Sequence, residues 1–443
     1  MSKSTTQFAC QSCGATTSKW SGKCMQCGAW DSLVESVVIG KNKTGRVKSV
    51  PTSKPERFHS ITSAEKSRIK TGNSEVDSVL GGGIVPGSLT LLAGDPGIGK
   101  STLVLQLAAE IAKTHKVLYV SGEESAAQVK LRGTRLKNLH TEFDFLATTD
   151  VDEVLAHAGS GAYHLIVVDS IQTMVSQELS GAAGTTSQIT NNTNSLVRAA
   201  KSTNTAFIII GHVTKEGNVA GPRLMEHLVD TVLYLEGERY GLLKMLRSVK
   251  NRFGSTNSVG MLEMTEEGLR AVANPSEALL QERQQLPGSV IFVGMEGSRP
   301  ILVEVQALVS PSVYGYPKRV ADGFDLNRLG LLCAVMQKRG GVNLSNQDVY
   351  VNIVGGIRLS EPAIDLAIIL SIASAANGKV INPKTVVFGE VGLSGEVRSV
   401  NMPKLRLAEA KKLGFDRAIL PASTKGAEKL GVHTIAEAIK LLK

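Results

Sequence analysis

The chain has 443 residues, 42% of them apolar and 20% charged, a composition that indicates a folded protein with several domains and excludes a wholly disordered chain. Almost all of its net charge of +9 comes from residues 1–70, where 12 Lys and Arg stand against 4 Asp and Glu. This asymmetry favours a polyanionic partner, although a solvated tail and linker would carry the same charge.

Four of the five cysteines form two pairs near the N-terminus, Cys10-x-x-Cys13 and Cys24-x-x-Cys27. Thiolates two residues apart can hold one tetrahedral zinc from a tight turn, and the glycine after each second cysteine helps backbone N–H groups to face the sulfurs. Four thiolates leave no open coordination position. We therefore predict a structural Zn²⁺ in a ribbon at residues 1–32, with a redox dithiol pair as the alternative.

Composition then divides the rest of the chain. Residues 33–58 are basic and rich in Gly, Ser, Pro and Thr, which predicts a linker. Short apolar strands alternate with helical segments through residues 59–272, which indicates a parallel sheet buried on both faces. From Thr231 onward, Gly-containing turns predict antiparallel strands. A second linker is expected at residues 273–286, before a C-terminal domain at residues 287–443.

A phosphate-binding loop of the form G-x-x-x-x-G-K-[ST] lies between an apolar strand and a helix. Its glycines and the helix N-terminus would direct N–H groups at phosphate oxygens, with Lys100 on the β- and γ-phosphates and Ser101 on Mg²⁺. Asp169 ends the apolar strand at residues 165–168 and is expected beside the Mg²⁺. A glycine-rich turn without a ligand is the alternative. The residues predicted to bind ATP and Mg²⁺ are Gly94, Asp95, Pro96, Gly97, Ile98, Gly99, Lys100, Ser101, Thr102 and Asp169.

Two acids, Glu123 and Glu124, follow the apolar strand at residues 117–120. Parallel strands end at the same sheet edge as the phosphate loop, so these acids are expected to face the γ-phosphate. Glu123 is our candidate for the carboxylate that activates water, and acids in the first turn of a helix are the alternative. His212, after the strand at residues 206–210, is a candidate γ-phosphate sensor or a simple loop histidine.

Two polar segments follow the strand that ends at Asp169, at a position where a ring-forming motor could present loops to its central channel. Residues 176–194 are small, polar and almost uncharged, and we expect them to be mobile because they cannot bury much surface. Residues 215–223 form a second such loop, with Lys215 and Arg223.

The sequence K-N-R-F-G ends a later apolar strand. Lys250 and Arg252 are two residues apart, so on a strand both side chains point to the same face. Against a neighbouring subunit's γ-phosphate they would act as a paired finger in trans, and a basic hairpin edge at the surface is the alternative. The predicted trans-acting motif is Lys250, Asn251, Arg252, Phe253 and Gly254.

In this order, the four-cysteine ribbon, GDPGIGKS, LIVVD and KNRFG resemble the RadA (Sms) family of bacterial DNA repair proteins over essentially the whole chain. The resemblance implies a zinc ribbon, an α/β RecA-like P-loop ATPase and an α+β domain similar to Lon proteases, assembled as a hexameric ring. It implies an ATP-driven, helicase-like motor for branch migration, acting on single-stranded and branched DNA with RecA recombinase. The implied catalytic residues are Lys100, Glu123, Asp169, Lys250 and Arg252.

Lon proteases use a Ser–Lys dyad, with the serine in a G-P-S-A-G-type run before a helix. Here the serine position is Ala363, which has no nucleophilic atom, and Ser360 lies too far along the chain to replace it. The family's lysine matches Lys404. We therefore expect no proteolysis. The apolar run at residues 362–376 predicts a buried helix. The remaining roles for this domain are ring assembly and sequence-tolerant DNA binding. The candidate DNA contacts are Lys215, Arg223, Arg319, Lys338, Arg339 and Arg358.

Three functional hypotheses remain open. The first is a DNA-dependent ATPase and branch-migration motor in recombinational repair. The second is a RecA-like regulatory ATPase or adaptor whose nucleotide state controls assembly without translocation, and an ATP-dependent protease is a distant third. No apolar run reaches the length of about 18 residues needed to span a membrane, and no signal peptide is evident. We expect a cytoplasmic protein, associated with the nucleoid when it acts on DNA.

Overall fold

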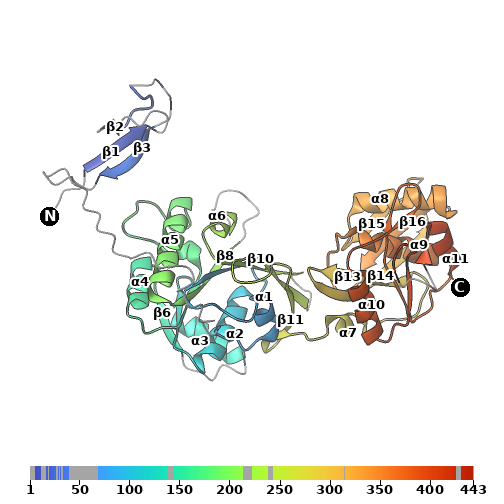
Figure 1. The fold of residues 1–443 in the computed structure, drawn as a ribbon, viewed down its shortest axis with the longest axis horizontal. Coiled ribbons are helices and arrows are strands. Elements are labelled where there is room, and N and C mark those ends of the chain that lie inside the picture. The colour runs from blue at the N-terminus through green and yellow to red at the C-terminus, as the bar shows by residue number, and fades with distance from the viewer. Residues whose placement is uncertain are drawn as a thin grey trace. The chain divides into compact units, whose positions relative to one another are not determined.

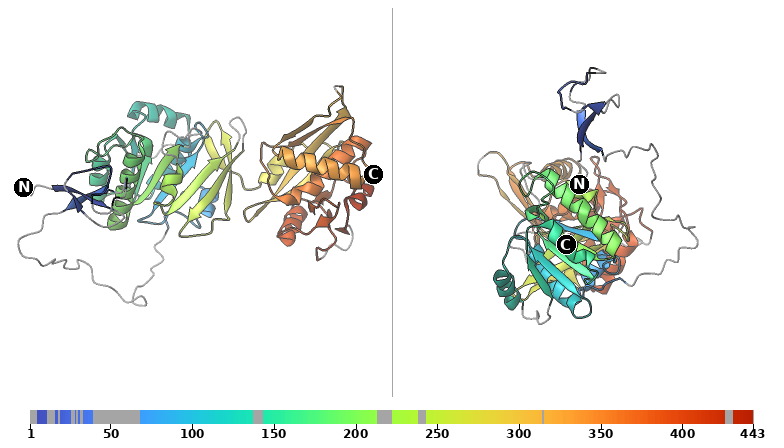
Figure 2. Two further views of the ribbon diagram at one scale, coloured as in Figure 1. Left: turned by 90° about the horizontal axis from the view of Figure 1, so that it is seen from above. Right: turned by 90° about the vertical axis from the view of Figure 1, so that its left-hand side faces the viewer.

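The computed structural model describes residues 5–10, 16–17, 19–25, 28, 30, 33–38, 68–136, 143–212, 222–237, 243–313, 315–425 and 431–442. The chain divides into two compact units, Met1–Ala64 and Glu65–Lys443. Many of their helices and strands are labelled in Figure 1, and Figure 2 gives two further views.

The first unit contains a three-stranded antiparallel sheet in the order β2–β1–β3. Its strands are β1 (Thr5–Cys10), β2 (Thr16–Thr17) and β3 (Leu33–Val38). Cys24 is buried, and its carbonyl accepts a hydrogen bond from the Gly28 N–H at 2.9 Å. Gly28 has a φ of 72°, in the left-handed region, which is the kind of turn predicted for the second cysteine pair. Cys13 and Cys27 lie outside the described residues, and only the backbone of Cys10 is described.

The second unit begins with a nine-stranded sheet in the order β12–β11–β10–β9–β4–β8–β7–β5–β6. The six strands from β9 to β6 run parallel, and β10, β11 and β12 add on antiparallel. The predicted parallel sheet is therefore confirmed, except that β9 pairs parallel with β4 as well as antiparallel with β10. The strands are β4 (Leu89–Gly94), β5 (Val117–Ser121), β6 (Asp144–Ala147), β7 (Leu165–Asp169), β8 (Ala206–His212), β9 (Thr231–Glu236), β10 (Leu243–Asn251), β11 (Val259–Thr265) and β12 (Gly268–Ala271).

Helices cover both faces of this sheet, and a separate buried cluster lies under each layer (Figure 1). One layer holds α1 (Ser74–Val79), α2 (Lys100–Ala112) and α3 (Ala126–Arg135). The other holds α4 (Val151–Gly159), α5 (Thr186–Thr203) and α6 (Pro222–Glu226). Along β5, Tyr119 joins the first cluster while Leu118 and Val120 join the second, because successive strand residues point to opposite faces.

The expectation of a mobile loop over residues 176–194 is wrong for residues 186–194, which form the first half of α5. Gln188 and Asn192 are fully buried in that helix. The Gln188 amide accepts from the Ser176 N–H at 2.9 Å and donates to the Ser176 carbonyl at 3.2 Å, and Asn192 donates to the Met174 carbonyl at 2.8 Å. These amides satisfy backbone groups of the preceding segment, which favours the burial of a polar sequence here, although Asn192 Oδ1 and Thr193 Oγ1 are buried without a hydrogen-bond partner.

The C-terminal part of the second unit is built on a seven-stranded sheet in the order β15–β16–β14–β13–β17–β20–β21. Its strands are β13 (Ser289–Glu296), β14 (Arg299–Pro311), β15 (Arg319–Asp322), β16 (Gln347–Ile353), β17 (Thr385–Val387), β20 (Arg417–Pro421) and β21 (Gly431–Val432), and β18 (Glu390–Val391) pairs separately with β19 (Val397–Arg398). The helices are α7 (Pro275–Leu280), α8 (Leu326–Val335), α9 (Asp365–Asn377), α10 (Pro403–Lys412) and α11 (Ile435–Lys440).

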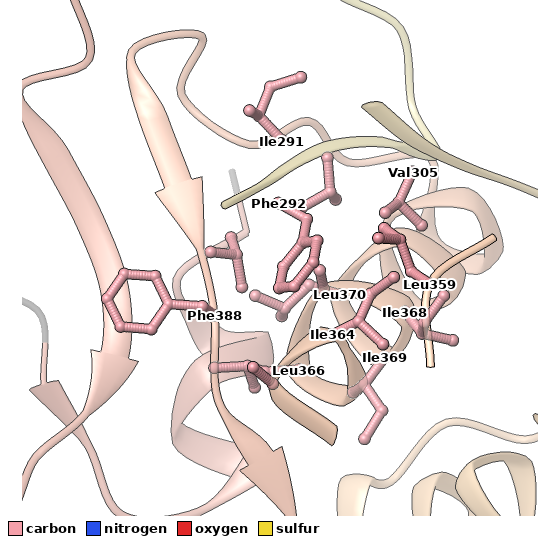
Figure 3. Close-up of a cluster of buried hydrophobic side chains, with 14 of the residues drawn as sticks. Ile291, Phe292, Val305, Leu359, Ile364, Leu366, Ile368, Ile369, Leu370 and Phe388 are labelled. Atoms are coloured by element: carbon pink, nitrogen blue, oxygen red, sulfur yellow. The ribbon is translucent and has the colours of Figure 1, made fainter. Parts of the chain in front are cut away.

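Helix α9 forms the centre of this domain, and its residues from Asp365 to Ser374 are all buried. Figure 3 shows Phe292 of β13 pointing toward Ile364 and Leu370. The predicted buried helix is thereby confirmed. Within the described part of the chain, no helix has the length and apolar character needed to cross a membrane.

Candidate nucleotide-binding site

The loop between β4 and α2 has the backbone of a phosphate cradle. Gly94, Gly97 and Gly99 have φ values of 150°, 78° and 111°, which L side chains rarely adopt. A Cβ on Gly94 would lie 2.4 Å from the Leu235 carbonyl oxygen, and one on Gly99 would lie 2.6 Å from Met264 Cε. Nothing lies within 4 Å of a Cβ built on Gly97, so this part of the loop borders open space that a phosphate can fill.

Lys100 stands at the start of α2 with only 4% of its surface exposed. Its Nζ donates to the carbonyls of Gly94 at 2.8 Å and Asp95 at 3.0 Å, which holds the amine against the loop. Burial lowers the pKa of Lys100, and the nearby carboxylates of Asp169, Asp95 and Glu123 oppose that shift. Ser101 follows in the first turn of the same helix. The amine of Lys100 and the hydroxyl of Ser101 thus lie at the end of the phosphate loop, where α2 begins.

Asp169 ends β7 and is 3% exposed. Its Oδ2 accepts a hydrogen bond from the Tyr119 hydroxyl at 2.7 Å. Mg²⁺ prefers a few carboxylate and hydroxyl oxygens completed by phosphate and water, and Asp169 with Ser101 offers that donor set. The residues present therefore fit a nucleoside triphosphate with its Mg²⁺.

Glu123 lies just beyond β5, with its carboxylate facing the end of β7 and β8. Its Oε1 accepts from Ser170 Oγ at 2.5 Å and lies 3.4 Å from His212 Nε2. The hydrogen bond from His212, helped by the one from Ser170, lowers the pKa of Glu123 to about 2 against the opposing effect of burial. Glu123 is therefore ionised at neutral pH, as a group that orients water must be.

Glu124 points elsewhere. Its carboxylate forms an ion pair with Arg132 of α3, and its N–H donates to Ser121 Oγ at 3.0 Å. The helix begins after its N-cap Ser125, with no acid in its first turn. Both acids precede the helix, so the alternative interpretation, which placed them in its first turn, is wrong.

Lys100, Glu123, Asp169 and His212 thus meet at one edge of the sheet, at the carboxyl ends of β4, β5, β7 and β8. Parallel strands bring these chain-distant positions together, as the sequence predicts.

Lys250 and Arg252 lie toward the other end of the same strands. Lys250 pairs with Val232 of β9, and the Arg252 N–H donates to the Asp230 carbonyl at 3.2 Å, beside Leu89 at the start of β4. Gly94 is five residues further along β4, roughly 16 Å away for an extended strand. Arg252 is therefore remote from the phosphate loop of its own chain, while Lys250 is level with Leu91 and lies on β10, which β9 separates from β4.

The two cations lie close together, but β10 ends at Asn251, so Arg252 stands in the turn after the strand and not on the strand as predicted. Burial lowers the pKa of Lys250, and the charge of Arg252 adds to that shift. Lys250 Nζ donates to the carbonyls of Glu226 at 2.7 Å and His227 at 3.2 Å, while Arg252 Nη1 donates to Asp230 Oδ1 at 3.0 Å.

The rest of the motif forms a braced turn. Asn251 Oδ1 accepts from the Phe253 N–H at 2.9 Å, and Arg68 Nη2 donates to the Phe253 carbonyl at 2.7 Å. Gly254 packs against Gly81 and Asn251, where a Cβ would lie 3.4 Å and 3.0 Å from their atoms. The Arg252 side chain is 49% exposed and Phe253 is 37% exposed, so this turn presents both to the surface.

The candidate DNA contacts have different surroundings. Lys215 lies outside the described residues, as does the side chain of Arg223. Arg319 donates to the carbonyls of Lys318, Leu344 and Gln347 at 2.6–3.1 Å, which ties its guanidinium to its own domain. Lys338 and Arg339 are exposed.

Arg358 is also exposed, but it lines a cleft of about 650 Å³ together with Asp322, Asp325 and Glu390. These carboxylates disfavour a phosphate backbone at that point.

The region that corresponds to a Lon catalytic dyad has no nucleophile. Ala363 is 3% exposed, and Ser360 and Lys404 are both at the surface. The buried polar centre is instead Arg406, whose guanidinium donates to Glu361 at 2.6 Å and 3.0 Å.

Sequence reasoning missed three residues of the domain with the phosphate loop that hold others in place: Tyr119, Ser170 and Asp230. Ser170 had a signal, because it directly follows Asp169. Tyr119 could have been found by aligning neighbouring strands of the predicted sheet. Asp230 had no local signal, because its role depends on two strands pairing across more than 100 residues.

Three family models match the chain. One described as an AAA domain matches residues 52–218, and one described as a rubredoxin metal binding domain matches residues 8–35. One described as subunit ChlI of Mg-chelatase matches residues 333–424. The first two cover the predicted nucleotide and zinc sites.

Relatives match the chain along its whole length. The DNA repair protein RadA of Halalkalibacterium halodurans is 48% identical and covers 100% of this chain and 99% of that protein. RadA of Bacillus subtilis is 49% identical, with 99% of each chain covered, and RadA of Listeria monocytogenes is 47% identical, with 99% and 98% covered. Among solved structures, the crystal structure of the RadB recombinase covers 46% of this chain and 99% of that one, with 24% identity and a TM-score of 0.37.

Proposed function

This chain belongs to the RadA family of bacterial DNA repair proteins, and on that premise we propose that it is a DNA-dependent ATPase and helicase-type motor. Its role would be branch migration on recombination intermediates, on single-stranded and branched DNA and together with RecA recombinase. The proposed cofactors are ATP, Mg²⁺ and a structural Zn²⁺ held by Cys10, Cys13, Cys24 and Cys27.

The proposed chemistry assigns one task to each side chain at the sheet edge. Lys100 would neutralise the β- and γ-phosphates, and Asp169 with Ser101 would hold the Mg²⁺. Glu123, ionised and fixed by Ser170 and His212, would orient the attacking water. His212 contacts the same oxygen of Glu123. Loss of the γ-phosphate would alter the position of Glu123, and His212 would transmit that movement to β8.

The observation that carries the proposal is the placement of Lys250 and Arg252 near the start of β4, while the phosphate loop lies at its other end. Cations placed there cannot serve their own nucleotide, but they can reach that of a neighbouring subunit. A head-to-tail contact of this kind closes into a ring when the rotation between subunits allows it, which favours the hexameric motor. The missing nucleophile at Ala363 argues against the protease reading.

The test is ATP hydrolysis with and without single-stranded DNA, on the wild-type full chain, Lys250→Ala and a control, Lys130→Ala. Lys130 is an exposed lysine of α3 outside the proposed site. We expect DNA to stimulate the wild type and the control, and Lys250→Ala to lose that stimulation while still binding a fluorescent ATP analogue.

Equal turnover with and without DNA in all three proteins would contradict the motor. Assembly that depends on ATP but not on DNA would then favour the regulatory ATPase, and degradation of casein would favour the protease.

A further inference from the structure

We infer that Tyr119 is a positioning residue of the nucleotide site, whose hydroxyl fixes the orientation in which Asp169 meets Mg²⁺. The inference rests on the proposed function, because it assigns a task within that same site. Tyr119 lies on β5 and Asp169 at the end of β7, and the Tyr119 hydroxyl donates to Asp169 Oδ2 at 2.7 Å.

The strand register explains why the residue is a tyrosine. Tyr119 stands opposite Val167, and Ser121 stands opposite Asp169, so the carboxylate is two residues further along the neighbouring strand. Residues two apart on a strand point to the same face, and such diagonal neighbours are about 7–8 Å apart. Serine or threonine is too short to cover that distance, and phenylalanine covers it without a donor.

The ring of Tyr119 is held in place by apolar neighbours. Tyr119 has no exposed surface, and its ring stacks on Phe145 of β6 with centroids 6.2 Å apart. Phe143 approaches the same ring at 6.0 Å in a tilted arrangement. The hydroxyl is therefore held in place by packed aromatic rings, as a group that orients a metal-binding carboxylate must be.

The hydrogen-bond donor to Asp169 is not the nearby cation Lys100. Lys100 donates to the carbonyls of Gly94 and Asp95, while the phenol of Tyr119 binds the buried carboxylate. One oxygen of Asp169 is thereby committed, which leaves the other for the Mg²⁺ shell. Without the hydroxyl, the carboxylate can turn toward Lys100, and the fit to Mg²⁺ weakens.

The test measures Mg²⁺ dependence at equilibrium, without turnover. The full-length chain is titrated with Mg²⁺ in the presence of a fluorescent, non-hydrolysable ATP analogue, and affinity for the analogue is also measured in EDTA. In Tyr119→Phe we expect the Mg²⁺ concentration at half-saturation to rise about tenfold, as is typical when an outer-shell partner of a metal ligand is removed. Affinity in EDTA should remain at the wild-type value, because the phenol does not contact the phosphate loop.

The matched control is Tyr163→Phe. The Tyr163 hydroxyl also donates to a carboxylate, Asp144 Oδ2 at 2.8 Å, but at an exposed position outside the site. We expect no change in its Mg²⁺ requirement. Tyr119→Leu, which removes the ring as well, should unfold at a lower temperature than Tyr119→Phe and yet share its Mg²⁺ requirement.

A folded Tyr119→Phe whose Mg²⁺ half-saturation differs from wild type by less than about twofold overturns the inference, since removing a hydrogen-bond partner of a metal ligand usually weakens metal binding by more than that. An equal loss of affinity with and without Mg²⁺ also overturns it, because that pattern indicates a general packing role. If Tyr119→Phe does not fold, 4-fluorophenylalanine at position 119 keeps the ring and fills the place of the hydroxyl without a donor, and an unchanged Mg²⁺ requirement there has the same meaning. A wild type that binds no nucleotide at all refutes the proposed function instead.

Discussion

Arg252 and Leu89 share one buried carboxylate, that of Asp230. Arg252 Nη1 donates to its Oδ1 at 3.0 Å, and the Leu89 N–H donates to its Oδ2 at 3.2 Å. Asp230 is 3% exposed, while the Arg252 side chain is half exposed. One carboxylate therefore ties the K-N-R-F-G motif to the first residue of the strand that carries the phosphate loop at its other end.

Asp230 should stabilise the fold through its hydrogen bond from Leu89 and position Arg252 through its ion pair. We expect Asp230→Ala to lower the free energy of unfolding by about 1–3 kcal/mol, because it leaves the buried Leu89 N–H without an acceptor. Asp230→Asn keeps a carbonyl oxygen for Leu89 and should retain most of that stability. Urea denaturation followed by circular dichroism measures both, and equal losses would contradict the shared-carboxylate role.

If Lys250 acts on a neighbouring subunit, two variants that each lack DNA-stimulated ATP hydrolysis should restore that activity when mixed. Lys100→Ala lacks its own phosphate-loop cation, and Lys250→Ala lacks the finger, so a mixed ring has some interfaces with both groups intact. With random mixing in equal amounts, about a quarter of the interfaces are complete, and ATP turnover should approach that fraction of wild type. Turnover no higher than in either variant alone would show that Lys250 does not act in trans.

Glu123 should be needed for hydrolysis and not for binding. We expect Glu123→Gln to lower the ATPase rate by about 10²-fold or more, since it removes the charge that orients water. Binding of a fluorescent ATP analogue should persist. Glu124→Gln is the matched control, because its carboxylate pairs with Arg132. If the control loses as much activity, the assignment between the two acids is wrong.

The depressed pKa of Glu123 also predicts an effect on acid stability. The pKa falls from its ordinary value of 4.5 to about 2 in the fold, so the ionised carboxylate stabilises the protein above pH 4.5. That contribution is lost as the pH falls from 4.5 toward 2. Glu123→Gln should therefore lose less stability than wild type over this interval, as measured by urea denaturation at several pH values. Parallel curves would contradict the hydrogen bonds from His212 and Ser170.

Gln188 should hold the segment before α5. Its side chain exchanges two hydrogen bonds with Ser176 and donates to the Leu179 carbonyl at 3.0 Å. We expect Gln188→Ala to cost about 1–3 kcal/mol of stability and to speed proteolysis within residues 176–185, because buried backbone groups lose their partners. Gln177→Ala is the control, since Gln177 bonds only at the exposed surface. Identical cleavage rates would contradict the anchor.

Restoring the serine should not restore a protease. Ala363→Ser adds a hydroxyl at a position that is 3% exposed, while Lys404 is at the surface. Without a base in hydrogen-bond reach, the hydroxyl stays unreactive, so we expect no cleavage of casein or of short fluorogenic peptides. Any serine-dependent cleavage would mean that Lys404 can approach residue 363.

The residues proposed to bind phosphate and metal are predictable from sequence because each belongs to a short local pattern. Gly94 to Ser101 must lie between a strand and a helix, and Asp169 and Glu123 must follow apolar strands. Parallel pairing then places these strand ends at one edge, so the site assembles from local rules and one topological rule. The four-cysteine spacing and the missing serine at Ala363 are equally local.

Other features depend on partners far away in the chain. Gln188 and Asn192 belong to a segment that is typical of a loop, and their burial is favourable only because Ser176 and Met174 offer backbone groups to bond. The sequence makes Arg319 a candidate DNA contact. In the structure its guanidinium donates instead to three carbonyls of its own domain. Tyr119 and Asp230 gain their roles from strand register alone. The sequence determines the chemistry of each side chain. Packing decides whether that side chain faces a ligand or a neighbouring residue. Hydrogen bonds and van der Waals contacts act only at short range, so distant residues become partners only when the chain folds.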